Sequence, residues 1–104
     1  MEKISSELLE DNPEYYDLVE QYLTFLEKEL DHLKALLQQN EVTNFKLLCH
    51  KLKGSSITYG YPELNSVFIE LYDMDNLENK KVSSLLHRAD LLMIGMKSWF
   101  HSLK

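Results

Sequence analysis

The chain has few of the residues that interrupt helices: its 104 residues include only three glycines and two prolines. Apolar residues recur every three or four positions, and they lack the strict alternation that is typical of half-buried strands. A chain of this length is normal for one domain and too short for two. We therefore expect residues 1–104 to form a single all-α domain.

Cysteine is nearly absent as well, and long apolar stretches are missing. The single cysteine, Cys49, cannot form a disulfide within the chain, which suits a reducing cytosol. No apolar stretch is long enough to span a bilayer, and the first residues, MEKISSELLEDNPEYY, lack the apolar core of a signal peptide. The sequence therefore predicts a soluble, cytoplasmic protein without a membrane partner.

Acidic residues outnumber basic ones: the chain has 17 Asp and Glu but only 11 Lys and Arg, which gives a formal net charge of -6. Such a surface should repel nucleic acid. One window, residues 42–62, contains no acidic residue but does contain Lys46, Lys51 and Lys53. The acidic protein is therefore expected to carry one locally basic surface.

The apolar spacing predicts four long helices and one short leading helix. The short helix covers residues 4–10. The long helices cover residues 13–39 and 42–59, a segment that begins at residue 62 and fades within 75–80, and residues 82–103. Long helices with short connections pack most economically as an antiparallel four-helix bundle.

The residues at the expected helix ends have suitable backbone preferences. Asn12 is expected to cap the first long helix, with Pro13 in its first position. Asn40 is expected to end that helix, Gly60 to end the second, and Pro62 to open the third.

The core-facing residues expected on the first long helix are Tyr15, Leu18, Tyr22, Phe25, Leu26, Leu30, Leu33 and Leu37. Those expected on the last helix are Val82, Leu85, Ala89, Leu92, Met96, Trp99 and Leu103.

On a helical wheel of residues 44–60, His50 points almost directly away from the apolar arc. That arc consists of Phe45, Leu48, Leu52 and Tyr59, flanked by Cys49, Ser55 and Ser56. His50 is therefore expected to be exposed near the middle of a helix whose opposite face is core, and Cys49 is expected to be a packing residue.

The surface around His50 is unusual for a solvated helix face. Gly54 lies inside a helix, where glycine costs up to about 1 kcal/mol relative to alanine. Leu47 and Ile57 are apolar on the side away from the core. A neutral imidazole is a nucleophile, and lysines could stabilise the negative charge of a phosphoryl group bound to it. Glycine would let a partner's backbone approach, and the two apolar side chains could be buried by that partner.

The segment His50-Lys51-Leu52-Lys53-Gly54-Ser55-Ser56, followed by Gly60 and then Leu64, resembles the signature of histidine-containing phosphotransfer (HPt) domains. The resemblance covers most of the chain, because the helices before and after the signature lie where the family has them. It implies that His50 carries a phosphoryl group on Nε2 and that Lys53 steadies the phosphoryl oxygens. It also implies that Gly54 leaves room for the partner, while Ser55 and Ser56 permit close packing under the site.

The resemblance implies partners too. The chain would exchange phosphoryl groups with the aspartate of a response-regulator receiver domain, a hybrid sensor histidine kinase, or both. The Mg²⁺ would be bound by the receiver, so the chain itself would need no metal or other cofactor and would be a carrier without an ATP site. The residues expected to dock the partner are Lys46, Leu47, Lys51, Gly54 and Ile57.

Other interpretations stay open at this point. The same bundle could be an adaptor that docks a receiver or a kinase without being phosphorylated. Lys46 and Lys51 could form a solvated rim that steers a partner only weakly, and Lys53 could be an ordinary surface lysine. A metal-dependent hydrolase would need inward-facing Glu-x-x-His pairs on two helices, and the sequence has this spacing only once, at Glu29 and His32. His32, His87 and His101 lie singly on different helices and are expected to be incidental.

One stretch departs from the family pattern. Family members commonly have leucine, cysteine, leucine and an acidic or amide residue on the third helix, where this chain has Leu64, Phe68, Leu71 and Tyr72. The hydroxyl of Tyr72 could accept a hydrogen bond from Nδ1 of His50 and so orient the imidazole. The alternative is a half-buried packing residue with its hydroxyl in water.

Overall fold

The computed structural model describes residues 3–77 and 80–103. In chain order it contains α1 (Glu7–Asp11), the 3-10 turn η1 (Pro13–Tyr15), α2 (Tyr16–Gln38), α3 (Val42–Thr58), α4 (Pro62–Asp73) and α5 (Lys80–His101). The described residues include no strand. The predicted all-α class is confirmed.

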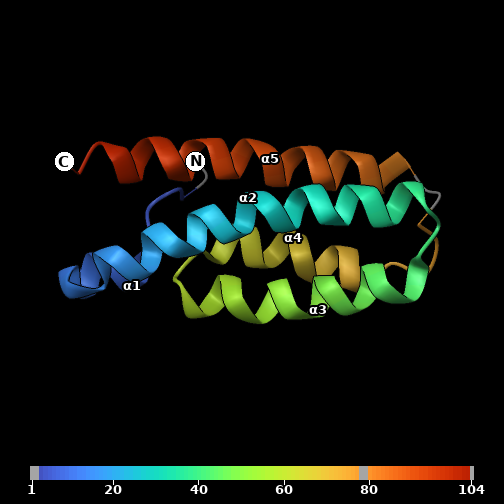
Figure 1. Ribbon diagram of the computed structural model, residues 1–104, viewed down its shortest axis with the longest axis horizontal. Coiled ribbons are helices and arrows are strands. Elements are labelled where there is room, and N and C mark those ends of the chain that lie inside the picture. Colours follow the sequence, from blue (N-terminus) through green and yellow to red (C-terminus); the bar gives the residue numbers. More distant parts are fainter. Residues whose placement is uncertain (1–2, 78–79, 104) are drawn as a thin grey trace.

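The four long helices form a bundle in which consecutive helices run in opposite directions (Figure 1). Helix α2 packs against α3 and α5, and α4 packs against the same two helices. Helices α3 and α5 are therefore diagonal partners, and their outward faces point to different sides of the molecule.

The core consists of aliphatic and aromatic side chains from all four helices. Its largest fully buried members are Tyr61, Phe45, Phe68, Phe100, Leu26, Leu30, Leu33, Leu52, Leu64, Leu71, Leu92 and Met96. Ion pairs at the rim join α5 to its neighbours: Lys34 contacts Asp90 at 2.7 Å, and Arg88 contacts Glu63 at 3.3 Å. Because these pairs are partly solvated, each contributes at most about 1 kcal/mol, and the apolar core dominates stability.

Two of the predicted helix ends are confirmed. Asn40 has a φ of 56°, and the amide of Glu41 donates to the carbonyl of Leu36 at 2.9 Å. Gly60 has a φ of 82°, and the amide of Tyr61 donates to the carbonyl of Ser56 at 2.9 Å. Both turns are left-handed helix terminations, for which asparagine and glycine are the suitable residues. Helix α4 then begins at Pro62, as predicted.

The start of the first long helix differs from the prediction. Asn12 makes no side-chain cap bond to the following turn. Its amide group instead donates to the carbonyl of Leu8 at 3.1 Å, at the end of α1. The 3-10 turn η1 comes next, and α2 begins only at Tyr16. The prediction was wrong because a short helix immediately upstream competes for the same polar side chain.

At the start of α2, the side chains that face the core differ from those predicted. Tyr16 stacks on Phe100 of α5, with ring centroids 4.4 Å apart. This contact turns Val19 and Leu23 into the core and leaves Leu18 exposed. Tyr15 is exposed as well.

Smaller differences affect other expected core residues. Leu36 is buried, whereas Leu37 is only partly buried. On α5, Trp99 packs against the core while partly exposed, and Leu103 lies beyond the helix and is exposed. The expected core position of Leu103 is wrong because α5 ends at His101.

The short helix α1 lies against the turn between α3 and α4. It is shifted relative to the expected 4–10 because Ser6 caps it, accepting a hydrogen bond from the amide of Leu9 at 3.1 Å. The hydroxyl of Ser6 also donates to the carbonyl of Tyr59 at 2.6 Å. A Cβ on Gly60 would lie 2.3 Å from the amide nitrogen of Leu8, so this close approach requires glycine.

Candidate functional site

His50 lies near the middle of α3 with its side chain exposed. Its neighbour Cys49 is fully buried, as is Leu52 two positions later. Leu47 and Ile57 are 63% and 54% exposed on the outward side. The predicted division of this helix into a core face and a face around His50 is therefore confirmed.

Gly54 lies one turn after His50 on the outward face of α3. Apart from its helix's own backbone, no described heavy atom would lie within 4 Å of a Cβ added at this position. The folded chain therefore has no packing reason for glycine here, although glycine weakens a helix by up to about 1 kcal/mol. The open space suits close approach by another molecule.

The backbone beneath the site is held by small polar side chains. Ser56 is buried and donates to the carbonyl of Lys53 at 3.0 Å, and Ser55 donates to the carbonyl of Leu52 at 3.2 Å. From α4, the amide of Asn65 also donates to the carbonyl of Lys53, at 2.6 Å. Sequence reasoning missed Asn65, because no motif marks a contact between two helices.

Lys46 is bound to the end of α4. Its ammonium donates to the carbonyls of Leu71 at 3.2 Å and Tyr72 at 2.6 Å, and also to that of Met74. The last turn of α4 has no basic residue of its own, and a cation at a helix C-terminus is stabilising. Lys46 therefore has a structural partner, and its expected part in docking stays a prediction.

Lys51 and Lys53 each contact an aromatic ring from another helix. The ammonium of Lys51 lies 5.1 Å from the ring centroid of Phe25 on α2, and that of Lys53 lies 4.6 Å from the ring centroid of Tyr72 on α4. In the described part of the chain, neither these two lysines nor Lys46 is paired with a carboxylate. These three lysines therefore form no ion pair with the described acidic side chains.

Tyr72 reaches the site from α4 and is 38% exposed. Its ring centroid lies 5.4 Å from that of His50, with an angle of 44° between the ring planes. Within residues 3–77 and 80–103, no hydrogen bond joins the Tyr72 hydroxyl to the imidazole. The structure thus brings Tyr72 beside His50, while its orienting role stays a prediction.

A comparison with known families shows which family the chain belongs to. The sequence matches the Hpt domain family over residues 17–96, a range that contains His50, the lysines around it and Tyr72. The chain belongs to the Hpt domain family. Hpt domains are phosphotransfer carriers in two-component phosphorelays, and they are not kinases. No curated protein and no solved structure gave a significant match.

The cysteine and the other three histidines of this Hpt domain are not part of the predicted site around His50. Burial raises the pKa of Cys49 to about 12, so its thiol stays protonated at neutral pH and serves packing. His32, His87 and His101 are exposed on α2 and α5. Among the described residues, no group of three or more His, Cys, Asp or Glu side chains could hold a metal ion. The expectation that Mg²⁺ comes with the partner stays a prediction.

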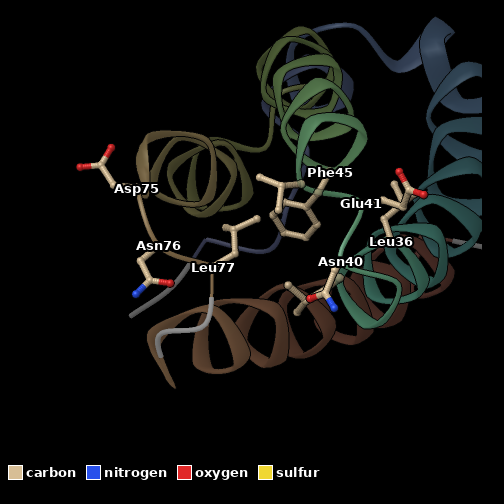
Figure 2. A pocket seen from close by; sticks show the side chains of 9 residues that line it. Leu36, Asn40, Glu41, Phe45, Asp75, Asn76 and Leu77 are labelled. Carbon is tan, nitrogen blue, oxygen red and sulfur yellow. The ribbon is translucent and has the colours of Figure 1, made fainter.

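A small cavity of about 200 Å³ lies at one end of the bundle (Figure 2). It lies between the turn after α2 and the segment after α4, and its lining includes Leu36, Phe45 and Leu77, with Glu41 and Asp75 at its edge. None of the described residues that line it belongs to the predicted site. The predicted site on the outward face of α3 therefore lies apart from this cavity.

Among the described helices, none combines the length and the apolar character needed to cross a membrane.

Proposed function

We propose that His50 is the residue that carries the phosphoryl group, which it exchanges with the aspartate of a receiver domain. In the accepting direction, the Nε2 lone pair forms the N–P bond while the P–O bond of the aspartyl phosphate breaks and the carboxylate leaves. The observation that carries the proposal is the exposed imidazole on a helix face with an uncovered glycine and with lysines that pair with no carboxylate of residues 3–77 and 80–103.

The surroundings of His50 support particular roles for its neighbours. Lys53 would contact the phosphoryl oxygens, because it lies one turn away and, among the described residues, its ammonium contacts a ring face and no carboxylate. Leu47, Gly54 and Ile57 would form the surface that a receiver covers, with Lys46 and Lys51 at its margin. Any Mg²⁺ would be bound by the receiver. We also propose that the partner is a response-regulator receiver, a hybrid sensor histidine kinase, or both, and that the domain works in the cytoplasm.

The first test measures transfer of label from a phosphorylated receiver domain to the wild-type chain and to His50→Gln. We expect acid-labile, base-stable label on the wild type and none on His50→Gln, with unchanged helicity in both. His87→Gln is the matched control, because it removes another exposed helical histidine. Label that persists in His50→Gln would contradict the assignment.

Two further arms of the same assay separate the alternatives. ATP and Mg²⁺ without a phosphodonor protein should give no label, whereas robust self-labelling would indicate a kinase. Receiver binding without any label on the wild-type chain would instead indicate the adaptor function.

A further inference from the structure

The ring of Tyr72 lies where three polar side chains of α3 meet α4. The imidazole of His50 lies 5.4 Å from it, the ammonium of Lys53 4.6 Å and the ammonium of Lys46 6.0 Å, each measured to the ring centroid. These side chains come from three successive turns of one helix face. Tyr72 is therefore the one described residue of α4 whose ring contacts both the candidate acceptor and its neighbouring lysine.

These contacts use the ring of Tyr72 and not its hydroxyl. In the described part of the chain, no hydrogen bond links that hydroxyl to His50 or to Lys53. An ammonium within about 6 Å of a ring centroid is attracted by the negative face of the ring. Lys46 is already bound by carbonyl oxygens at the end of α4. The cation that depends on the ring is therefore Lys53.

We propose that Tyr72 is a positioning residue whose ring face holds the ammonium of Lys53 beside His50. The inference rests on the proposed function of His50. A lysine side chain has a flexible four-carbon stem, so its ammonium would otherwise occupy many positions. On this proposal, contact with the ring limits the ammonium to fewer positions, from which it can reach a phosphoryl group on His50. Phosphoryl oxygens form stronger, charge-assisted hydrogen bonds and can draw the ammonium from the ring during transfer.

The kinetic test compares Tyr72→Leu with Tyr72→Phe at saturating phosphorylated receiver. Leucine removes the ring and should slow the transfer step about two- to fivefold, the effect expected for losing an exposed contact of this kind. Phenylalanine keeps the ring and should rescue the rate. Equal slowing by both variants would show that the hydroxyl matters, and an unaffected Tyr72→Leu would show that neither group does; either result overturns the proposal.

A double-mutant comparison tests whether Tyr72 acts through Lys53. Lys53→Gln removes the cation, so adding Tyr72→Leu to it should cause no further slowing. If the two effects multiply instead, Tyr72 acts independently of Lys53 and the proposal is wrong. Melting temperatures of all variants verify that each is folded at the assay temperature.

A last measurement needs no phosphoryl group, so it separates this inference from the proposed function. The side-chain methylene protons of Lys53 should show upfield ring-current shifts by NMR in the wild type and in Tyr72→Phe, and lose them in Tyr72→Leu. Identical shifts in all three proteins would overturn the inference even if His50 is labelled. Wild-type chain that shows the shifts but accepts no label would contradict the proposed function and leave the contact itself standing.

Discussion

Cys49 and His50 are adjacent in the sequence, yet one side chain is fully buried and the other lies in solvent. The same contrast runs along all of α3. Its inner face contains Leu52, packed without exposure, and its outer face contains Leu47, which is 63% exposed. The same residue type can therefore have two different effects on one helix. Burial of Leu52 stabilises the bundle, whereas exposure of Leu47 leaves apolar surface that a partner could cover.

The sharpest way to test this contrast is to truncate the same residue type on each face. Leu52→Ala should destabilise the domain by about 2–5 kcal/mol, because it removes buried methyl groups and leaves a cavity. Leu47→Ala should change stability by less than about 0.5 kcal/mol. Urea unfolding measures both. Equal losses would mean that the outer face is also part of the core.

Leu47→Ala should weaken receiver binding, and Leu91→Ala on α5 is its control. Leu91 is 54% exposed but lies on the diagonal helix, away from His50. Equal binding losses in both variants would argue against a docking surface on α3.

Gly54→Gln should have the next largest effect, which should be a loss of receiver binding without a loss of folding stability. A long side chain would fill the open space above the helix, and an unfavourable contact of about 1.4 kcal/mol would weaken receiver binding about tenfold. Titration of a receiver domain onto the variant measures this loss. Ser98→Gln, on the exposed surface of α5, is the matched control and should bind like the wild type. Wild-type affinity in Gly54→Gln would show that close approach is not needed.

Gly54→Ala should have the smallest effect, and its sign should be favourable. Alanine fits the helical backbone without meeting another atom of the described chain, so stability should rise by about 0.5–1 kcal/mol. Gly60→Ala, in the turn after the same helix, provides the contrast, because the positive φ of Gly60 and the backbone of Leu8 oppose any side chain there. Chemical unfolding of the two variants should therefore give shifts of opposite sign.

The features of α3 that could be predicted from the sequence are local ones. A helical wheel suffices to place His50 opposite Phe45 and Leu52, because the period of the helix fixes the directions of its side chains. Asn40 and Gly60 mark helix ends because their backbone preferences are intrinsic to the residue type. These predictions needed no knowledge of the neighbouring helices.

The features that could not be predicted depend on contacts between helices. Nothing in the sequence near Lys46 indicates that its ammonium binds the end of α4, and the contact between Lys53 and Tyr72 depends on how two helices are aligned. The expected core positions of Tyr15 and Leu18 were wrong for the same reason, since the stacking of Tyr16 on Phe100 determines which side chains of this turn face the core. Helix periodicity leaves such alignments undetermined.

The docking of α1 has a consequence for how the molecule assembles and opens. A helix of five residues is too short to persist alone in water, so α1 forms only when the turn at Gly60 exists to receive it. The hydrogen bond between Ser6 and Tyr59 ties α1 to the end of α3 across 53 positions of the sequence. Helix α1 is therefore expected to form only once the turn at Gly60 exists, and to be able to detach without unfolding the four long helices. Its detachment would uncover Leu9 at the end of the bundle while the middle of α3, with His50, stays folded.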